Sequence, residues 1–256
     1  MGNLLEGKTA LILGIANRWS LAWFIAQAFV REGARLAITY QGERQRAAVE
    51  ELAAELGAAM VRSCDVTQDE ELAELARGLE AYFGRLDAVV HSIAFAHRED
   101  LSRPFLETSK SGYLVAQEVS AYSLVSVSRA VARLMPQGGS ILTLSYLGAV
   151  RVVPNYNVMG VAKAALEACV RYLASELGPE GIRVNAISAG PVKTASARAV
   201  QGFSSMLDHV ASRAPLRRNA DPLEVADAAL FLASDLGRGV TGNVLYVDAG
   251  YQIMGM

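Results

Sequence analysis

A tyrosine and a lysine seven residues apart, Tyr156 and Lys163, are the side chains whose types and spacing best suit proton chemistry. Seven residues of α-helix turn through about 700°, so both side chains would lie on one face, two turns apart. A lysine ammonium near a phenol favours the phenolate, lowers the pKa of the tyrosine and makes it a usable proton donor or oxyanion partner. The N–H donors of the lysine can also hold a ribose hydroxyl. Taken alone, such a pair is more often amphipathic surface.

Seven short runs of β-branched and apolar residues predict strands, and the segments between them have apolar residues at the spacing of helices. Helical spacing is clearest over Ala47–Leu56, Glu70–Tyr82 and Ala162–Leu177. Regular alternation of strand and helix indicates right-handed crossovers and a parallel sheet covered on both faces. We therefore expect a doubly wound α/β fold forming one domain over residues 1–256. The expected strands are Thr9–Leu13, Leu36–Tyr40, Met60–Ser63, Ala88–His91, Ser140–Ser145, Arg183–Ser188 and Val244–Val247.

The composition is that of a globular chain, since 52% of the 256 residues are hydrophobic and 20% are charged. The 24 basic and 26 acidic residues give a net charge of −2 without a basic cluster, which disfavours a nucleic-acid partner. Cys64 and Cys169 are too few for a disulfide framework and favour a reducing compartment. His91, His97 and His209 have no partners at ligand spacing, so no metal is expected.

No segment resembles a membrane span or an export signal. The charge-free stretch 134–150 is broken by a proline and two glycines. At the N-terminus, charged residues at positions 6 and 8 run directly into a predicted strand and leave no room for a signal's apolar region. We expect a cytoplasmic protein without a membrane partner.

The turn after the first predicted strand could bind a pyrophosphate. Gly14 ends the strand and Ser20 opens a helix, whose N-terminal N–H groups and positive dipole end favour anions. The usual G-x-G-x-x-G spacing is absent, because small residues replace most of its glycines. From these residues alone, an ordinary strand–helix turn is an equally good interpretation.

Two further strand ends carry small or polar residues, Cys64-Asp65-Val66 and His91 to Ala96. Ligands of open α/β sheets bind outside the carboxyl ends of the strands, so these turns are expected to share one crevice, although Asp65 could instead cap a helix. After the second strand, the neutral Gln41 stands where an acidic ribose-binding residue is usual. Gln41 favours NADH, while Arg44 and Arg46 keep NADPH possible.

Several motifs agree in order and spacing: Gly14 followed by Ser20, Ser92-Ile93-Ala94-Phe95, Leu144-Ser145-Tyr146-Leu147-Gly148, the Tyr156–Lys163 spacing, and Ala189-Gly190-Pro191. With them the chain resembles the short-chain dehydrogenase/reductase superfamily, and more closely its enoyl-[acyl-carrier-protein] reductase branch of the NADH-dependent type. It departs from the commoner superfamily motifs, which are T-G-x-x-x-G-x-G, N-N-A-G and Tyr-x-x-x-Lys. The resemblance covers residues 2–254 and implies a Rossmann-like fold.

The resemblance implies roles for individual residues. Tyr156 would contact the thioester carbonyl oxygen, Lys163 would hold the nicotinamide ribose, and Tyr146 would stand near the place of the catalytic serine in commoner reductases. These three form the implied catalytic set. The implied cofactor-binding set is Gly14, Ser20, Leu21, Gln41, Asp65, Val66, Ile93, Lys163, Val192, Lys193, Thr194, Ala195 and Ser196. The substrate-binding set is Ala96, Tyr146, Tyr156, Met159, Phe203 and Met206, the last two on a lid at about residues 194–212.

The implied reaction is reduction of the trans-2 double bond of enoyl-acyl-carrier-protein thioesters with NADH in fatty-acid elongation. Hydride adds to the β carbon, and Tyr156 donates a hydrogen bond to the developing enolate. The implied partners are acyl-carrier protein and further copies of the chain in a homotetramer. Apolar residues between Leu166 and Leu173 and at the C-terminal end 251–254 also favour an oligomer.

Two alternatives stay open from the sequence. A carbonyl reductase or alcohol dehydrogenase of the same superfamily would favour a lysine where Gly160 stands and a serine where Tyr146 stands. A dinucleotide sensor without turnover would keep the fold alone, since a fold does not prove activity. The intact Tyr156, Lys163 and Tyr146 argue against the sensor.

Overall fold

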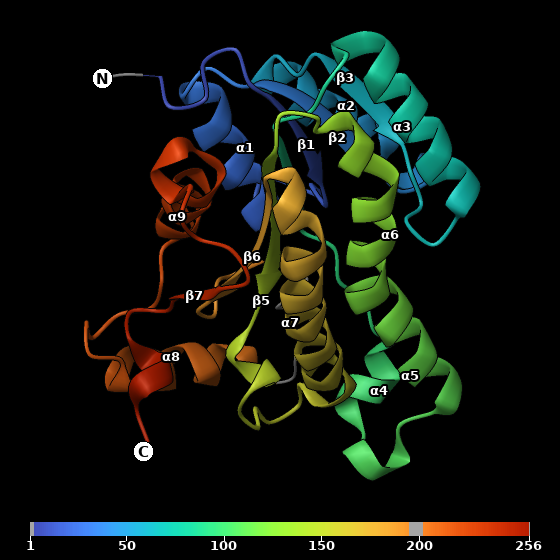
Figure 1. Ribbon diagram of the computed structural model, residues 1–256. Helices are drawn as coiled ribbons and strands as arrows, with labels where there is room; N and C mark the ends of the chain where they lie inside the picture. The colour runs from blue at the N-terminus through green and yellow to red at the C-terminus, as the bar shows by residue number, and fades with distance from the viewer. Residues whose placement is uncertain (1–2, 195–201, 256) are drawn as a thin grey trace.

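The computed structural model describes residues 3–194 and 202–255, which form a parallel sheet between layers of helices (Figure 1). The strands lie in the order β3-β2-β1-β4-β5-β6-β7, and every neighbouring pair is parallel. The predicted seven-stranded parallel sheet is therefore confirmed, and each strand ends within one residue of its expected limit. The bounds are β1 Thr9–Leu13, β2 Arg35–Tyr40, β3 Met60–Ser63, β4 Ala88–His91, β5 Gly139–Ser145, β6 Ile182–Ala189 and β7 Val244–Val247.

Helices cover both faces of the sheet, as a doubly wound fold requires. One face packs against α1 (Leu21–Arg31), α2 (Glu43–Leu56) and α9 (Pro222–Ala233), and the other against α3 (Asp69–Phe83), α6 (Ser123–Val131) and α7 (Asn157–Leu177). In β1, Ala10 and Ile12 contact the first layer and Leu11 and Leu13 the second, which explains why the strand is apolar throughout. None of the described helices is long and apolar enough to cross a membrane.

Three further helices lie at the carboxyl end of the sheet, toward the bottom of Figure 1: α4 (Arg98–Ser102), α5 (Lys110–Gln117) and α8 (Phe203–Arg213). The strand order reverses between β1 and β4, since β2 and β3 lie on one side of β1 and β4 to β7 on the other. In such sheets the crevice for a ligand lies at this reversal, outside the carboxyl ends of the strands. The three helices therefore surround the expected binding region.

Three helices begin earlier than their apolar spacing indicates. α2 begins at Glu43 and α3 at Asp69, because their first turns are polar and add nothing to the apolar periodicity, and α7 begins at Asn157, ahead of the buried Val158 and Met159. Tyr156 is the N-cap residue of α7, between Asn155 and Asn157, whose φ angles are 62° and 39°. It therefore flanks the helix that carries Lys163, and the prediction that both lie within one helix needs this correction.

The turn between β1 and α1 lies directly against the end of β4. Gly14 has a φ of +100°, and a Cβ atom at this position would lie 2.0 Å from the carbonyl oxygen of Ser92. The amide of Ser92 also donates a hydrogen bond of 3.0 Å to Leu13 O. A residue with any side chain would push the two strand ends apart, so Gly14 is required by this close approach.

We predict that Gly14→Ala lowers the free energy of unfolding more than Gly57→Ala does. Both glycines have positive φ, which costs an L-residue roughly 1–2 kcal/mol. Only the Cβ at position 14 also meets backbone, because nothing lies within 4 Å of one at position 57. Overpacking of that kind costs a further ~1–3 kcal/mol. Urea unfolding of both cofactor-free variants at one protein concentration measures the difference, and equal losses would contradict the proposed close approach.

Candidate active site

A groove runs along the carboxyl ends of β1 to β4 at the strand-order reversal. It encloses about 350 Å³, and eight residues of the predicted cofactor set line it: Gly14, Ser20, Leu21, Gln41, Val66, Ile93, Lys163 and Thr194. Of the remaining five, Asp65 contacts Gln41, Val192 lines the neighbouring cavity and Lys193 is exposed. Ala195 and Ser196 lie outside the described residues.

The β1–α1 turn is built to receive an anion. The Ser20 hydroxyl accepts hydrogen bonds of 3.1 Å from the amides of Ala16 and Asn17, and the Asn17 side chain accepts one of 2.9 Å from Trp19 N. These contacts fix the loop before α1, whose first turn contains no acidic residue. The N-terminal N–H groups of α1 then face a groove without a competing carboxylate on that helix, which suits a pyrophosphate.

Gln41 and Asp65 join the ends of β2 and β3. The Gln41 amide donates a hydrogen bond of 2.9 Å to the Asp65 carboxylate, which also accepts hydrogen bonds from the amide and hydroxyl of Thr67. Burial favours the neutral acid, but these hydrogen bonds outweigh it and hold the pKa of Asp65 below its usual value. Asp65 is therefore an anion in a turn and not the helix cap considered above, since Gln68 occupies the N-cap of α3.

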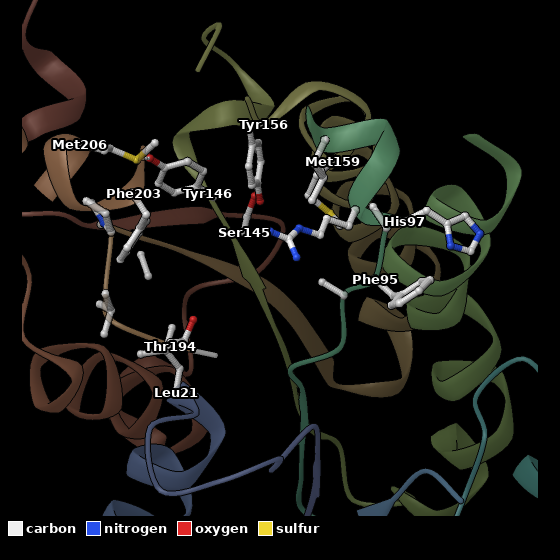
Figure 2. Close-up of a pocket in the computed structure, with 18 residues that line it drawn as sticks. Leu21, Phe95, His97, Ser145, Tyr146, Tyr156, Met159, Thr194, Phe203 and Met206 are labelled. Atoms are coloured by element: carbon white, nitrogen blue, oxygen red, sulfur yellow. Dashed lines mark hydrogen bonds between the residues drawn. The ribbon is translucent and has the colours of Figure 1, made fainter. Parts of the chain in front are cut away.

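A second, apolar cavity of about 490 Å³ adjoins the groove (Figure 2). All six predicted substrate residues line it: Ala96, Tyr146, Tyr156, Met159, Phe203 and Met206. The groove and the cavity share Leu21, Ala94, Phe95 and Thr194 in their walls. A molecule in the groove would therefore meet a molecule in the apolar cavity at this common wall.

The Tyr156 hydroxyl points into the apolar cavity, and its ring meets that of Tyr146 edge to face with centroids 5.0 Å apart (Figure 2). Burial raises the pKa of Tyr156 above that of free tyrosine, and the neighbouring Tyr146 adds to the effect. The predicted lowering of this pKa by Lys163 is thus wrong for the cofactor-free protein. The phenol stays protonated and can act as a hydrogen-bond donor.

Lys163 is buried and contacts the backbone of β5. Its ammonium group donates a hydrogen bond of 2.7 Å to the carbonyl oxygen of Leu144. Burial lowers the pKa of Lys163 to about 8, while the charge of Glu167 opposes that shift. Its side chain also lines the groove, so one cation lies where a bound ribose would need donors.

Tyr146 connects the cavity to helix α8. Its hydroxyl donates to the sulfur of Met206 at 3.3 Å, and burial raises its pKa to about 12. Figure 2 shows Phe203 and Met206 on the same side of the cavity as Tyr146. The part of the predicted lid that the structure describes thus contributes to the cavity wall, whereas residues 195–201 lie outside the description.

The loop after β4 forms the opposite wall, and sequence reasoning placed only its first part, His91 to Ala96, at the crevice. Phe95, His97 and Leu101 line the cavity beside the predicted Ala96. The Ser120 hydroxyl fixes this loop, because it accepts from Phe95 N at 2.9 Å and donates to Phe95 O at 3.0 Å. The five-residue α4 is too short to display helical periodicity, so no pattern could have placed His97 and Leu101 at a site.

Two further residues have contacts that the sequence did not predict: Ser145, which was part of a family motif without an assigned role, and Glu167. Ser145 lines the apolar cavity, but its hydroxyl donates to the Glu167 carboxylate at 2.5 Å. Asn157 also has a role that its sequence position hides, since its side chain donates to the carbonyl oxygens of Leu101 and Arg103 at 3.1 and 2.8 Å. This contact ties the α4 wall to the start of α7, beside Tyr156.

Comparison with known proteins gives matches over nearly the whole chain. A family model described as "Enoyl-(Acyl carrier protein) reductase" matches residues 14–252. The NADH-dependent enoyl-[acyl-carrier-protein] reductase FabI of Bacillus cereus is 53% identical over 254 residues, 98% of this chain and 99% of the relative. The NADPH-dependent FabI of Staphylococcus aureus is 49% identical over 249 residues, 96% of this chain and 97% of the relative.

The solved structures agree with the sequence relatives. The crystal structure of the Bacillus cereus reductase with NADP+ and an indole naphthyridinone is 52% identical, with a TM-score of 0.98 and 100% of each chain covered. Both the sequence motifs and the folded chain thus match one group of proteins from end to end. The chain belongs to the enoyl-[acyl-carrier-protein] reductase family of the short-chain dehydrogenase/reductase superfamily.

Proposed function

We propose that this chain reduces the trans-2 double bond of enoyl thioesters carried on acyl-carrier protein, with NADH as reductant, in fatty-acid elongation. The observation that carries the proposal is the junction of the two cavities. The groove at the carboxyl ends of the strands adjoins an apolar pocket that presents the Tyr156 hydroxyl. An acyl chain requires such an apolar pocket, and its thioester carbonyl requires a donor at the pocket's inner end.

The groove presents groups that would hold each part of NADH. The N-terminus of α1 would hold the pyrophosphate, Gln41 the adenosine ribose, and Val66 and Ile93 the apolar parts. Lys163 would donate to the nicotinamide ribose. When bound, NADH supplies the hydride that reduces the β carbon of the enoyl group.

The residues of the chain act on the thioester oxygen. As the β carbon is reduced, negative charge moves through the conjugated system to the carbonyl oxygen. Tyr156 stays protonated because burial raises its pKa, so its O–H can donate a hydrogen bond to that oxygen. Protonation of the α carbon then gives the saturated acyl chain. Tyr146 lies edge to face against Tyr156 and would restrict its ring.

Two contacts favour this reaction over carbonyl reduction, which would use a lysine at position 160 and a serine donor. A Cβ atom at Gly160 would lie 2.8 Å from the carbonyl oxygen of Gly148, so a lysine at position 160 does not fit. The Ser145 hydroxyl donates its hydrogen bond to the Glu167 carboxylate, so it is not free to serve as the serine donor of a carbonyl reductase. The tyrosine donor and apolar cavity also favour turnover over a dinucleotide sensor.

The lid, the cellular location and the oligomeric state belong to the same proposal. We infer that residues about 194–212 cover the acyl chain, supported by Phe203 and Met206 in the cavity wall. A cytoplasmic location follows from the carrier-bound substrate. The homotetramer needs a different argument from the expected one, because Leu166, Val170 and Leu173 are buried within the chain's own core. Its support is the exposure of Tyr113, Leu114, Tyr122 and Tyr172 on α5, α7 and the turn after α5.

We predict that Tyr156→Phe lowers kcat/KM for a trans-2-enoyl thioester by about 10²–10³, the usual loss for one oxyanion donor. NADH absorbance measures turnover, with a 3-ketoacyl thioester and NADPH offered in parallel. Tyr82→Phe is the matched control, because that tyrosine is 54% exposed on α3 and lines neither the groove nor the apolar cavity. Turnover of the ketoacyl compound alone would favour the carbonyl reductase, and cofactor binding without any turnover would favour the sensor.

We predict that NADH binding depends on the protonated form of Lys163. The dissociation constant should be flat below the pKa of about 8 and rise above it, because the neutral amine loses its charge-assisted donors. Lys163→Met should weaken binding at pH 7 about 10- to 100-fold, as loss of a hydrogen bond from a charged group does. It should also remove the pH dependence. NADH fluorescence titrations from pH 6 to 9 measure both, and an unchanged slope in the variant would refute the assignment.

We predict a particle of four chains in solution, hence about four times 27.3 kDa. Exposed tyrosine and leucine side chains on adjoining helices are typical of surfaces that assembly covers. Light scattering at micromolar concentration measures the mass. A monomer of 27.3 kDa would reject the homotetramer without affecting the proposed reaction.

A further inference from the structure

Glu167 is a buried carboxylate for which the proposed reaction has no role so far. The residue is 5% exposed and lies on the core-facing side of α7, between the buried Leu166 and Val170. A carboxylate in such a position is costly to bury unless it is hydrogen-bonded and balanced by positive charge. Its partners therefore indicate what it does.

Two consecutive residues at the end of β5 are fastened to two consecutive turns of α7. Leu144 accepts through its carbonyl oxygen from Lys163 Nζ at 2.7 Å, and Ser145 donates through its hydroxyl to Glu167 Oε1 at 2.5 Å. Lys163 and Glu167 are four residues apart, a spacing that brings side chains together on a helix. The two hydrogen-bonded pairs lie next to each other in the interior, directly before Tyr146, and the Lys163 and Glu167 charges interact without a direct ion pair.

The charges around these two pairs come from three elements. Glu167 and Lys163 interact with each other, and His91 on β4 interacts with the Lys163 charge. Arg171 on α7 and Tyr246 on β7 interact with Glu167. His91 is neutral, since burial and Lys163 lower its pKa to about 3, and its ring bonds Thr143 and Ser123. Glu167 is thus the acidic group that interacts with Lys163 among the described residues.

We propose that Glu167 is a positioning residue for the reaction, which keeps Lys163 protonated for cofactor binding and holds Ser145, and with it Tyr146, at the cavity wall. The proposal rests on the proposed function, since it assumes that the Lys163 ammonium binds the cofactor. Burial alone would favour the neutral amine, and the carboxylate one turn away opposes this.

The charge and the hydrogen bond of Glu167 can be separated by substitution. A glutamine at position 167 keeps an oxygen that accepts from Ser145 but removes the charge, whereas Ser145→Ala keeps the charge and removes the donor. If the role of Glu167 were purely structural, Ser145→Ala would have the larger effect, because it removes the hydrogen bond. If Glu167 keeps Lys163 protonated, Glu167→Gln has the larger effect, because it removes the charge.

The test is the pH dependence of NADH binding by fluorescence titration in the full-length protein. Glu167→Gln should shift the alkaline rise of the dissociation constant by about one pH unit toward acid, the lower range for loss of a nearby opposite charge. Glu167→Asp should restore the wild-type position. Glu176→Gln is the matched control, because it removes an exposed carboxylate from the same helix. Glu167→Met gives a second neutral side chain if the glutamine variant does not fold.

Repeating the substitution in a Lys163→Arg protein tests whether the effect on the pH profile acts through Lys163. In a Lys163→Arg protein, Glu167→Gln should leave the pH profile where it is, because arginine stays charged throughout this range. The proposal would be overturned if the NADH dissociation constant of Glu167→Gln and Glu167→Met began to rise at the same pH as in the wild type. It would also be overturned if Ser145→Ala shifted that pH as far as Glu167→Gln does.

A second measurement does not depend on the cofactor. The pKa of Lys163 lies below its unfolded value of 10.5, so the unfolded chain binds more protons above about pH 8 and stability rises with pH there. Glu167→Gln should move the start of that rise toward acid in urea unfolding of the cofactor-free protein. If NADH binds to no variant, the proposed function fails, whereas this unfolding comparison still decides the role of Glu167.

Discussion

The carboxyl end of β5 is fastened to α7 by two buried hydrogen bonds, and the arrangement of the site depends on them. Lys163 bonds the carbonyl of Leu144 and Ser145 bonds Glu167, so strand and helix cannot slide relative to each other. The chain continues from this point into Tyr146, then into a turn whose carbonyl at Gly148 lies against Gly160. Both tyrosines of the cavity are therefore held relative to the lysine of the groove. Buried polar groups such as these are stabilising only when all are bonded, which makes the geometry specific.

The same burial sets the protonation states that the chemistry needs. Removing Tyr156 from water disfavours its anion and raises its pKa, and removing Lys163 from water disfavours its cation and lowers its pKa, so the two pKa values move apart. A phenol that stays protonated can donate a hydrogen bond but cannot act as a base. This suits the proposed role of Tyr156 toward the thioester carbonyl oxygen, which gains negative charge during the reaction. Lys163 is closer to losing its proton, because its lowered pKa of about 8 lies near neutral pH. Its protonation must therefore be supported by a neighbouring charge, and the neighbouring turn of the helix provides one.

The sheet could be predicted from the sequence because five of its seven strands, all but β3 and β7, are short runs buried on both faces, and such runs have visible ends. The first residues of the helices were harder to predict. The helices that begin at Glu43 and Asp69 have polar first turns, which add nothing to the apolar periodicity. The position of Tyr156 outside α7 depends on the positive φ of Asn157, which residue types alone do not specify. The residues of the site were predictable through the family motifs, but their pKa values were not, because desolvation depends on packing. Glu167 had one visible signal, its place four residues after Lys163 on an apolar helix face.

The adenosine end of the groove gives a physical reason for the choice of NADH. Gln41 offers no charge to a 2′-phosphate, and its amide already donates to the Asp65 carboxylate. Asp65 is held as an anion by that bond and by Thr67, so a phosphate beside Gln41 would meet a fixed negative charge. Arg46 could offset it, but its guanidinium is paired with Glu50 and Glu43. A ribose hydroxyl needs only hydrogen-bond partners there, so this end of the groove accepts the unphosphorylated cofactor more readily than the phosphorylated one.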